Sequence, residues 1–183
     1  VGEETTLARP ELPWERQEGT VLEGPVALQR DGKTFIVYAA SACWGPNYKL
    51  GMLTWLGGDP LAAESWSKGS EPVFQRSDEH GVYAPGHNTF FKSPDGTQDW
   101  IVYHANDQAT DVCDMGRTPR MQEFTWNADG TPNFGIPVGT STPLTHFHYG
   151  AVIQGLKTRY PGVGAEKLTP ATRYRMIVES GRL

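Results

Sequence analysis

The chain has 183 residues, with 16 Lys and Arg against 21 Asp and Glu and a formal net charge of −5. This acidic balance argues against a protein that binds nucleic-acid phosphates or an anionic membrane surface, because both functions favour a basic excess. No apolar run of about 18 residues occurs, so no membrane-spanning helix is predicted. The 38% of hydrophobic and 11% of aromatic residues suffice for a folded core.

Turn-forming residues are unusually frequent. The 21 Gly and 14 Pro are scattered between aromatic and β-branched runs, and long helical patterns are nearly absent. Such a distribution is typical of an all-β protein with many tight turns. The two cysteines are too few for a disulfide-stapled scaffold and lack the short paired spacing of a structural zinc site.

One sequence unit occurs twice. Residues 23–32 (Glu-Gly-Pro-Val-Ala-Leu-Gln-Arg-Asp-Gly) precede residues 33–38 (Lys-Thr-Phe-Ile-Val-Tyr), and residues 87–96 (His-Asn-Thr-Phe-Phe-Lys-Ser-Pro-Asp-Gly) precede residues 99–103 (Asp-Trp-Ile-Val-Tyr). In each copy, a β-type run meets an Asp-Gly turn and a second run returns, which indicates a hairpin.

The two copies continue in step. Residues 48–55 match 120–126, and residues 72–75 match 133–137 as the fourth strand of each unit. Each unit is therefore predicted to be a four-stranded meander, and the returning strands 34–39 and 100–103 are apolar enough to be covered on both faces. A repeated meander favours a β-propeller blade, although a sandwich stays open. Two blades do not close a ring, so we expect the chain to supply part of a propeller.

Glu23 and His87 occupy equivalent positions in the two copies. The first strand of a propeller blade lines the central channel, so both side chains are predicted to start at one channel mouth. A carboxylate and an imidazole brought together from separate blades are a candidate active site. Taken singly, a glutamate such as Glu23 is more often a solvated turn residue, and a histidine such as His87 is more often a hydrogen-bonded structural residue.

Five motifs in unbroken order, spread over residues 14–138, resemble the later blades of glycoside hydrolase family 43, on its arabinofuranosidase side. They are residues 21–28 (Val-Leu-Glu-Gly-Pro-Val-Ala-Leu), 34–43 (Thr-Phe-Ile-Val-Tyr-Ala-Ala-Ser-Ala-Cys), 47–54 (Asn-Tyr-Lys-Leu-Gly-Met-Leu-Thr), 81–90 (Gly-Val-Tyr-Ala-Pro-Gly-His-Asn-Thr-Phe) and 120–137, which begins Arg-Met-Gln-Glu-Phe-Thr-Trp.

This resemblance implies a five-bladed β-propeller of inverting enzymes that cut arabinofuranosyl or xylosyl groups from plant polysaccharides. It places the general acid on Glu23 and, on His87, the histidine that reaches the channel centre beside a calcium ion or a water cluster. The sugar-binding arginine corresponds best to Arg117, with Arg120 as the rival; either could instead be a solvated loop charge. Inverting hydrolysis also needs a second carboxylate as base.

The base and a second aspartate belong, by resemblance, to earlier blades, and no motif makes Asp107, Asp111 or Asp114 the base. We therefore expect activity only with an N-terminal polypeptide of the same propeller. Trp44 and Tyr83 could offer ring faces to a furanose or pack between blades. The alternatives to an α-L-arabinofuranosidase are a β-xylosidase or endo-arabinanase of the same family, or a non-catalytic carbohydrate-binding propeller.

The remaining expectations concern the cysteines and the C-terminal part. Cys43 and Cys113 both follow the second strand of their unit, and their pairing stays open; a disulfide would suit a secreted enzyme. Residues 1–138 are assigned to the propeller. Residues 139–183 are interpreted as a linker with one strand at 174–178, which completes the last blade or begins an appended module, and His146 and His148 are too few for a metal site.

Overall fold

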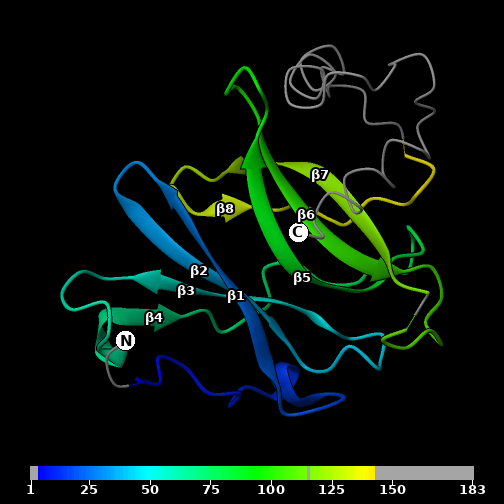
Figure 1. The fold of residues 1–183 in the computed structure, drawn as a ribbon, viewed down its shortest axis with the longest axis horizontal. Coiled ribbons are helices and arrows are strands. Elements are labelled where there is room, and N and C mark those ends of the chain that lie inside the picture. Colours follow the sequence, from blue (N-terminus) through cyan, green and yellow to red (C-terminus); the bar gives the residue numbers. More distant parts are fainter. Residues whose placement is uncertain (1–3, 115, 143–183) are drawn as a thin grey trace, which may run out of the picture. The chain divides into compact units, whose positions relative to one another are not determined.

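The computed structural model describes residues 4–114 and 116–142, and within them the chain is all-β, as predicted. Two four-stranded antiparallel sheets follow each other along the chain (Figure 1). The first contains β1 (Leu22–Arg30), β2 (Lys33–Ala40), β3 (Lys49–Trp55) and β4 (Trp66–Lys68), and the second contains β5 (Tyr83–Lys92), β6 (Asp99–Asn106), β7 (Thr118–Trp126) and β8 (Pro132–Asn133). The only helical segments described are two short 3-10 turns, η1 (Pro13–Arg16) and η2 (Ala63–Ser65).

Each sheet is a meander, because its spatial order is the order of its strands in the sequence. The first hairpin turns at Asp31 and Gly32, whose φ angles of 49° and 77° both lie in the left-handed region. A two-residue turn with both φ angles positive matches the right-handed twist of the strands it joins, and Asp-Gly is a preferred pair for it. The predicted repeat of four-stranded units is therefore confirmed.

The position of the fourth strand was predicted wrongly in the first unit. β4 lies at Trp66–Lys68, where it pairs with the end of β3, whereas residues 72–75 contribute only an isolated bridge between Phe74 and Leu50. In the second unit β8 overlaps the predicted range 133–137 only at Asn133. A three-residue strand is too short to show an alternating pattern. The strand was therefore predicted in the more apolar segment that follows it, at residues 72–75.

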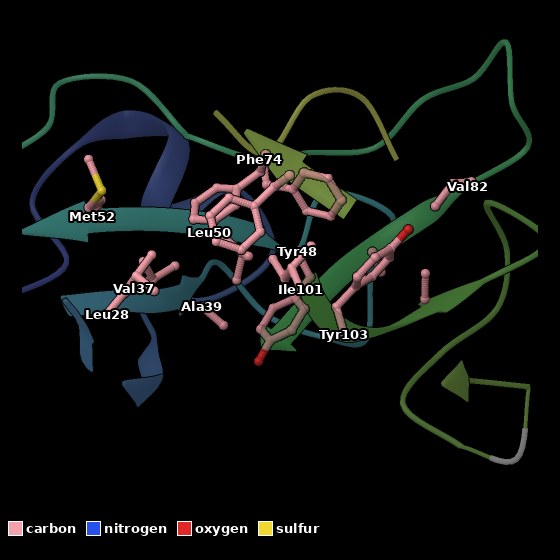
Figure 2. Packing of buried hydrophobic residues seen from close by; sticks show 14 of the residues in the cluster. Leu28, Val37, Ala39, Tyr48, Leu50, Met52, Phe74, Val82, Ile101 and Tyr103 are labelled. Atoms are coloured by element: carbon pink, nitrogen blue, oxygen red, sulfur yellow. The ribbon is translucent and has the colours of Figure 1, made fainter. Parts of the chain in front are cut away.

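The hydrophobic core takes side chains from both sheets, which belong to one compact unit of the chain. Figure 2 shows Leu50 and Met52 of β3 in the same cluster as Ile101 and Tyr103 of β6. The returning strands β2 and β6 are buried over most of their length, as their continuous apolar runs predicted. Burial of this kind holds the two sheets' adjacent ends in fixed positions.

The segment that contains η1 packs on the other face of the first sheet. Trp14 lies in a second apolar cluster with Tyr38 and Leu53, and its indole nitrogen donates to the Ser70 carbonyl at 2.7 Å. Glu15 is fully buried, and Lys68 donates to it at 2.8 Å. Burial alone would raise the pKa of Glu15, but hydrogen bonds from Lys68, two backbone amides and Tyr38 outweigh it and lower the pKa.

Residues Lys92–Gln98 belong to a second compact unit of the chain. This turn is held locally, since the Ser93 hydroxyl donates to Asp95 at 2.5 Å and the Thr97 amide donates to the same carboxylate at 3.1 Å. The expected strand at 174–178, the residues His146 and His148 and most of the predicted 139–183 segment lie outside the described residues. No helix in the described part of the chain is long and apolar enough to cross a membrane.

Candidate active site

The carboxylate of Glu23 starts from an irregular stretch of β1. Pairing of β1 with β2 slips between Glu23, opposite Ala39, and Val26, opposite Val37, so that one residue of β2 faces two of β1. Gly24 takes a φ of +56° there, and Pro25 has no amide hydrogen to donate to the ladder. A bulge of this kind changes the direction of neighbouring side chains and is frequent beside active sites.

His87 lies against this bulge, as its equivalence to Glu23 predicted. A Cβ atom added to Gly24 would lie 3.3 Å from the His87 ring, so the histidine of β5 packs on the residue that follows Glu23. His87 is itself a non-glycine residue with a positive φ, 51°, and its side chain is exposed. The backbone of each first strand is thus irregular at the point where His87 lies against Gly24.

Tyr48, immediately before β3, contacts Glu23 directly. Its hydroxyl donates to Glu23 Oε1 at 2.6 Å, and its side chain is fully buried. A Cβ at Gly86 would lie 2.1 Å from the ring of Tyr48, so only glycine at this position of β5 allows the ring to take its place. Burial raises the pKa of Tyr48 well above its ordinary value, and Glu23 raises it further.

His104, near the end of β6, stacks on the ring of this tyrosine. Its ring is parallel to that of Tyr48 at 5.6 Å and stacks on His87 at 6.2 Å between centroids. Burial, with the nearby charge of Arg117, lowers the pKa of His104 to about 4. His104 is therefore neutral at pH 7, and its Nε2 lies 3.5 Å from Nη1 of Arg117.

The two candidate arginines occupy different surroundings. Arg117 lies beside His104, and its positive charge acts on Tyr48, the residue that donates to Glu23. Arg120 points instead to Asp107, whose carboxylate accepts a hydrogen bond at 2.7 Å, and its side chain is largely buried. The geometry therefore brings Arg117 to the site and gives Arg120 a paired, structural position.

The two aromatic candidates differ in exposure. Trp44 is 56% exposed, and its indole nitrogen donates to the Glu18 carbonyl at 3.0 Å, so the ring is anchored with a face open. Tyr83, at the start of β5, is half-buried. Trp44 thus has the exposure that a sugar platform needs, whereas Tyr83 shows less of its ring.

Cys43 and Cys113 form a disulfide, with their Cα atoms 5.3 Å apart. The bond joins the loop between β2 and β3, which contains Trp44 and Tyr48, to the loop between β6 and β7, which contains Arg117. It settles the pairing that the sequence left open, and it ties the loop that contacts Glu23 through Tyr48 to the loop that contains Arg117.

A calcium ion would need six to eight oxygen ligands, most often from carboxylates and carbonyls. In residues 4–114 and 116–142, no three His, Cys, Asp or Glu side chains gather closely enough to hold a metal ion. Among the described residues, His87 contacts Gly24 and the ring of His104. Calcium at the channel centre therefore stays a prediction.

Sequence reasoning singled out Glu23, His87 and Arg117 but not Tyr48 or His104. Tyr48 opens the aligned run 48–55, and His104 lies one residue beyond the run 99–103. The available signal was glycine at position 86, next to His87, because a glycine inside a strand marks a close approach by another group.

The chain belongs to glycosyl hydrolases family 43, whose sequence profile matches residues 1–132. It is 45% identical to an extracellular exo-alpha-(1->5)-L-arabinofuranosidase of Streptomyces avermitilis, over 81% of this chain and 32% of that protein. It is 35% identical to alpha-L-arabinofuranosidase 43 of Humicola insolens, over 96% of this chain and 39% of that protein. The chain therefore spans about a third of the length of these relatives.

Solved structures agree with this assignment. The chain matches a crystal structure of an alpha-L-arabinofuranosidase from Lactobacillus brevis with a TM-score of 0.71 and 42% identity, over 76% of this chain and 44% of that one. It also matches a thermostable family-43 glycoside hydrolase with a TM-score of 0.66 and 26% identity, over 78% and 45% of the two chains. The two meanders are consistent with blades of a five-bladed β-propeller, as predicted.

Proposed function

We propose that this chain is part of an inverting α-L-arabinofuranosidase that removes arabinofuranosyl groups from plant polysaccharides, with Glu23 as general acid. The observation that carries the proposal is the hydrogen bond from Tyr48 to Glu23, with His104 and Arg117 of the second sheet beside Tyr48, in a chain whose relatives are named arabinofuranosidases. A carboxyl group set among a phenol, two imidazoles and a guanidinium has the surroundings of a proton-transfer site.

The proposed chemistry begins with a protonated Glu23. Its proton passes to the glycosidic oxygen while the bond from that oxygen to the anomeric carbon breaks, and Glu23 is left as a carboxylate. A water molecule on the opposite face of the sugar gives its proton to a second carboxylate and attacks the anomeric carbon. The two carboxyl groups of inverting glycosidases stand roughly 6.5–9.5 Å apart, which leaves room for this water.

We assign the second carboxylate and the additional aspartate to an N-terminal polypeptide of the same propeller. Among the described residues of the loop after β6, Asp107 is paired with Arg120, and Asp111 and Asp114 accept hydrogen bonds from backbone amides of that loop. These contacts suit carboxylates that shape a loop. In this proposal, mixing the chain with such a polypeptide restores activity that the chain lacks alone.

The other site residues have binding roles in this proposal. Arg117 keeps its charge at every working pH and donates to a sugar hydroxyl. Trp44 offers its open face to a ring of the polysaccharide, with Tyr83 at the margin. His87 holds ordered water, or a calcium ion with oxygen ligands outside the described residues, at the channel centre. The Cys43–Cys113 disulfide and the extracellular relative support secretion of the protein.

The test is Glu23→Gln in the complete protein, with arabinan oligosaccharides as substrate. Loss of the acid is expected to lower kcat by about 10²- to 10⁴-fold, because general acid catalysis contributes about that factor. The melting temperature stays almost unchanged, since Glu23 is only half-buried. The first-formed arabinose, followed by proton NMR, is expected to have the inverted anomeric configuration.

A matched control is Glu64→Gln, which removes the charge of an exposed glutamate in η2. This variant should hydrolyse the same oligosaccharides at the wild-type rate. A Glu23→Gln enzyme that keeps its rate would remove Glu23 from the acid role, and binding of arabinan without any turnover by the unaltered protein would favour a carbohydrate-binding propeller.

A further inference from the structure

We propose that Tyr48 is a positioning residue for the general acid: its hydroxyl holds Oε1 of Glu23 so that the proton is carried on Oε2, the oxygen that faces the leaving group. This inference rests on the proposed role of Glu23. It adds to that role a specific partner, contributed by the loop before β3, that sets both the direction of the carboxyl group and the strength of the acid.

The first step of the argument is that Tyr48 cannot move away from Glu23. Its side chain is fully buried, one edge lies against the backbone of Gly86, and one face is covered by the parallel ring of His104. An aromatic ring enclosed on several sides has a single rotamer available. The hydroxyl position is thus fixed by the packing of β3, β5 and β6, independently of Glu23.

The second step concerns the two oxygens of Glu23. Oε1 accepts the 2.6 Å hydrogen bond from Tyr48, while among the described residues no donor reaches Oε2. A carboxyl group that accepts a hydrogen bond on one oxygen carries its own proton on the other. The tyrosine therefore determines which oxygen of Glu23 is the acid, and it restricts rotation of the carboxyl group.

The third step is what happens as the proton leaves. Oε2 gives its proton to the glycosidic oxygen, the bond to the anomeric carbon breaks with both electrons on that oxygen, and negative charge appears on Glu23. The hydrogen bond from Tyr48 strengthens as this charge develops, because bonds to an ionised acceptor are shorter and stronger. Tyr48 keeps its own proton throughout, since burial and Glu23 raise its pKa well above the working range.

Three other titratable or charged side chains, His87, His104 and Arg117, surround the pair formed by Tyr48 and Glu23. His87 on β5 lies against the bulge of β1, His104 on β6 is neutral at pH 7 and stacks on Tyr48, and Arg117 before β7 adds a positive charge. None of the three touches Oε1 as Tyr48 does. Removing the tyrosine hydroxyl therefore has a separable effect, because the charges around the carboxyl group stay the same.

The experiment measures Tyr48→Phe in the complete protein, on two substrates across the pH range. With arabinan oligosaccharides, kcat is expected to fall about 10- to 100-fold, the range for one hydrogen bond to a developing charge. The alkaline limb of its pH profile is expected to move to higher pH, because the ionised carboxylate loses a hydrogen-bond donor. With 4-nitrophenyl α-L-arabinofuranoside, whose leaving group needs little protonation, the loss is expected to be under about threefold.

Tyr38→Phe is the matched control. Tyr38 is also buried in the first sheet and also donates to a carboxylate, Glu15 Oε1 at 3.0 Å, but on the face that packs against η1. It should lower the melting temperature without moving the pH profile or the ratio of the rates on the two substrates. If Tyr38→Phe moved the alkaline limb as much as Tyr48→Phe does, the shift would be a general effect of destabilisation and the proposal would be wrong.

Two further outcomes separate this inference from the proposed function. If Glu23→Gln abolishes activity while Tyr48→Phe leaves the pH profile and the substrate ratio unchanged, Glu23 remains the acid and Tyr48 is only structural. If Glu23→Gln keeps its rate, the proposed function itself fails.

Where Tyr48→Phe does not fold, a second variant tests the proposal. 3-Fluorotyrosine at position 48 is a stronger hydrogen-bond donor of similar shape, so it must move the alkaline limb to lower pH. An unmoved limb overturns the proposal.

Discussion

Two tyrosine–glutamate pairs lie at the first sheet, Tyr38 with Glu15 of η1 and Tyr48 with Glu23 of β1, and they differ in how many hydrogen bonds the carboxylate accepts. Glu15 is fully buried and accepts hydrogen bonds on both oxygens, from Tyr38, Lys68 and two backbone amides. Glu23 is half-buried and accepts one described hydrogen bond, from Tyr48. A carboxylate with every acceptor position filled is fixed as an ion, whereas one with a free oxygen can exchange a proton.

The difference shows why burial alone does not identify an active-site carboxylate. Glu15 is the more buried of the two and has the more perturbed environment, yet its partners all belong to the packing of η1 on the sheet. Glu23 accepts its described hydrogen bond from Tyr48, and the next residue, Gly24, lies against His87 of the second sheet. We call Tyr38–Glu15 the closed pair and Tyr48–Glu23 the open pair. The following changes test the distinction between them.

The largest effect on stability is expected from removing the disulfide. Cys43 and Cys113 are 70 residues apart in sequence, so the double change Cys43→Ser and Cys113→Ser should lower the free energy of unfolding by about 4 kcal/mol, the chain-entropy value for a loop of this length. Chemical denaturation measures the loss. Because the bond ties the loops beside the open pair, kcat should also fall under conditions where the protein stays folded, and unchanged kcat would contradict this link.

The next largest effect should come from the closed pair. Glu15→Gln leaves Lys68 without its ion-pair partner and places an amide among backbone donors, which we expect to cost about 2–3 kcal/mol of unfolding free energy. Activity per folded molecule should not change. The double variant with Lys68→Met removes the orphaned charge and should recover part of the loss in the same denaturation assay; a greater loss would show that Lys68 has another role.

Acidification should weaken the fold beside the open pair. The pKa of His104 is lowered to about 4 in the folded state, against about 6.5 for an ordinary histidine. Between these pH values His104 binds a proton in the unfolded chain but not in the folded one, so the free energy of unfolding falls as pH drops below about 6.5. His104→Gln should therefore flatten the decline in melting temperature between pH 7 and pH 4.5, by the equivalent of about 1–2 kcal/mol. Parallel curves would contradict the lowered pKa.

The smallest effect is expected at a contact away from both pairs. The Arg30 guanidinium lies 4.8 Å over the Trp126 ring and 3.7 Å from Asp99, with 42% of its side chain exposed. Arg30→Ala should cost about 0.5–1 kcal/mol, as usual for exposed contacts of this type. Arg30→Lys should retain part of the contribution. Neither variant should alter kcat. A change in kcat would show that the hairpin end of β1, where Arg30 lies, influences the site around Glu23.

The strands and the meeting of Glu23 with His87 could be predicted because the repeat aligned equivalent strands of two sheets. Arg117 and Arg120 could not be separated from sequence, because the choice depends on which residue of the loop before β7 turns toward His104 and which reaches Asp107. Tyr48 was missed for a similar reason. It reads as an ordinary core aromatic, and its contact with Glu23 depends on the three-dimensional closeness of β1, β3 and Gly86.

The fourth strand and the disulfide show two other limits. β4 has only three residues, so its position is set by pairing with residues 53–55 of β3, and its own composition carries little signal. Cys43 and Cys113 could pair only if two loops of unequal length met, and that depends on how the sheets pack. Local patterns thus predict strands well and contacts between sheets poorly.

Both sheets are built from strands that pair with their neighbours in sequence, and this has a consequence for how the chain folds as it is synthesised. The first sheet is complete once Lys68 has emerged from the ribosome, and the same residue supplies the ammonium group that Glu15 needs. Pairing between sequence neighbours closes short loops and is therefore fast. The first sheet, with η1 in place, can thus serve as the surface on which the second one assembles.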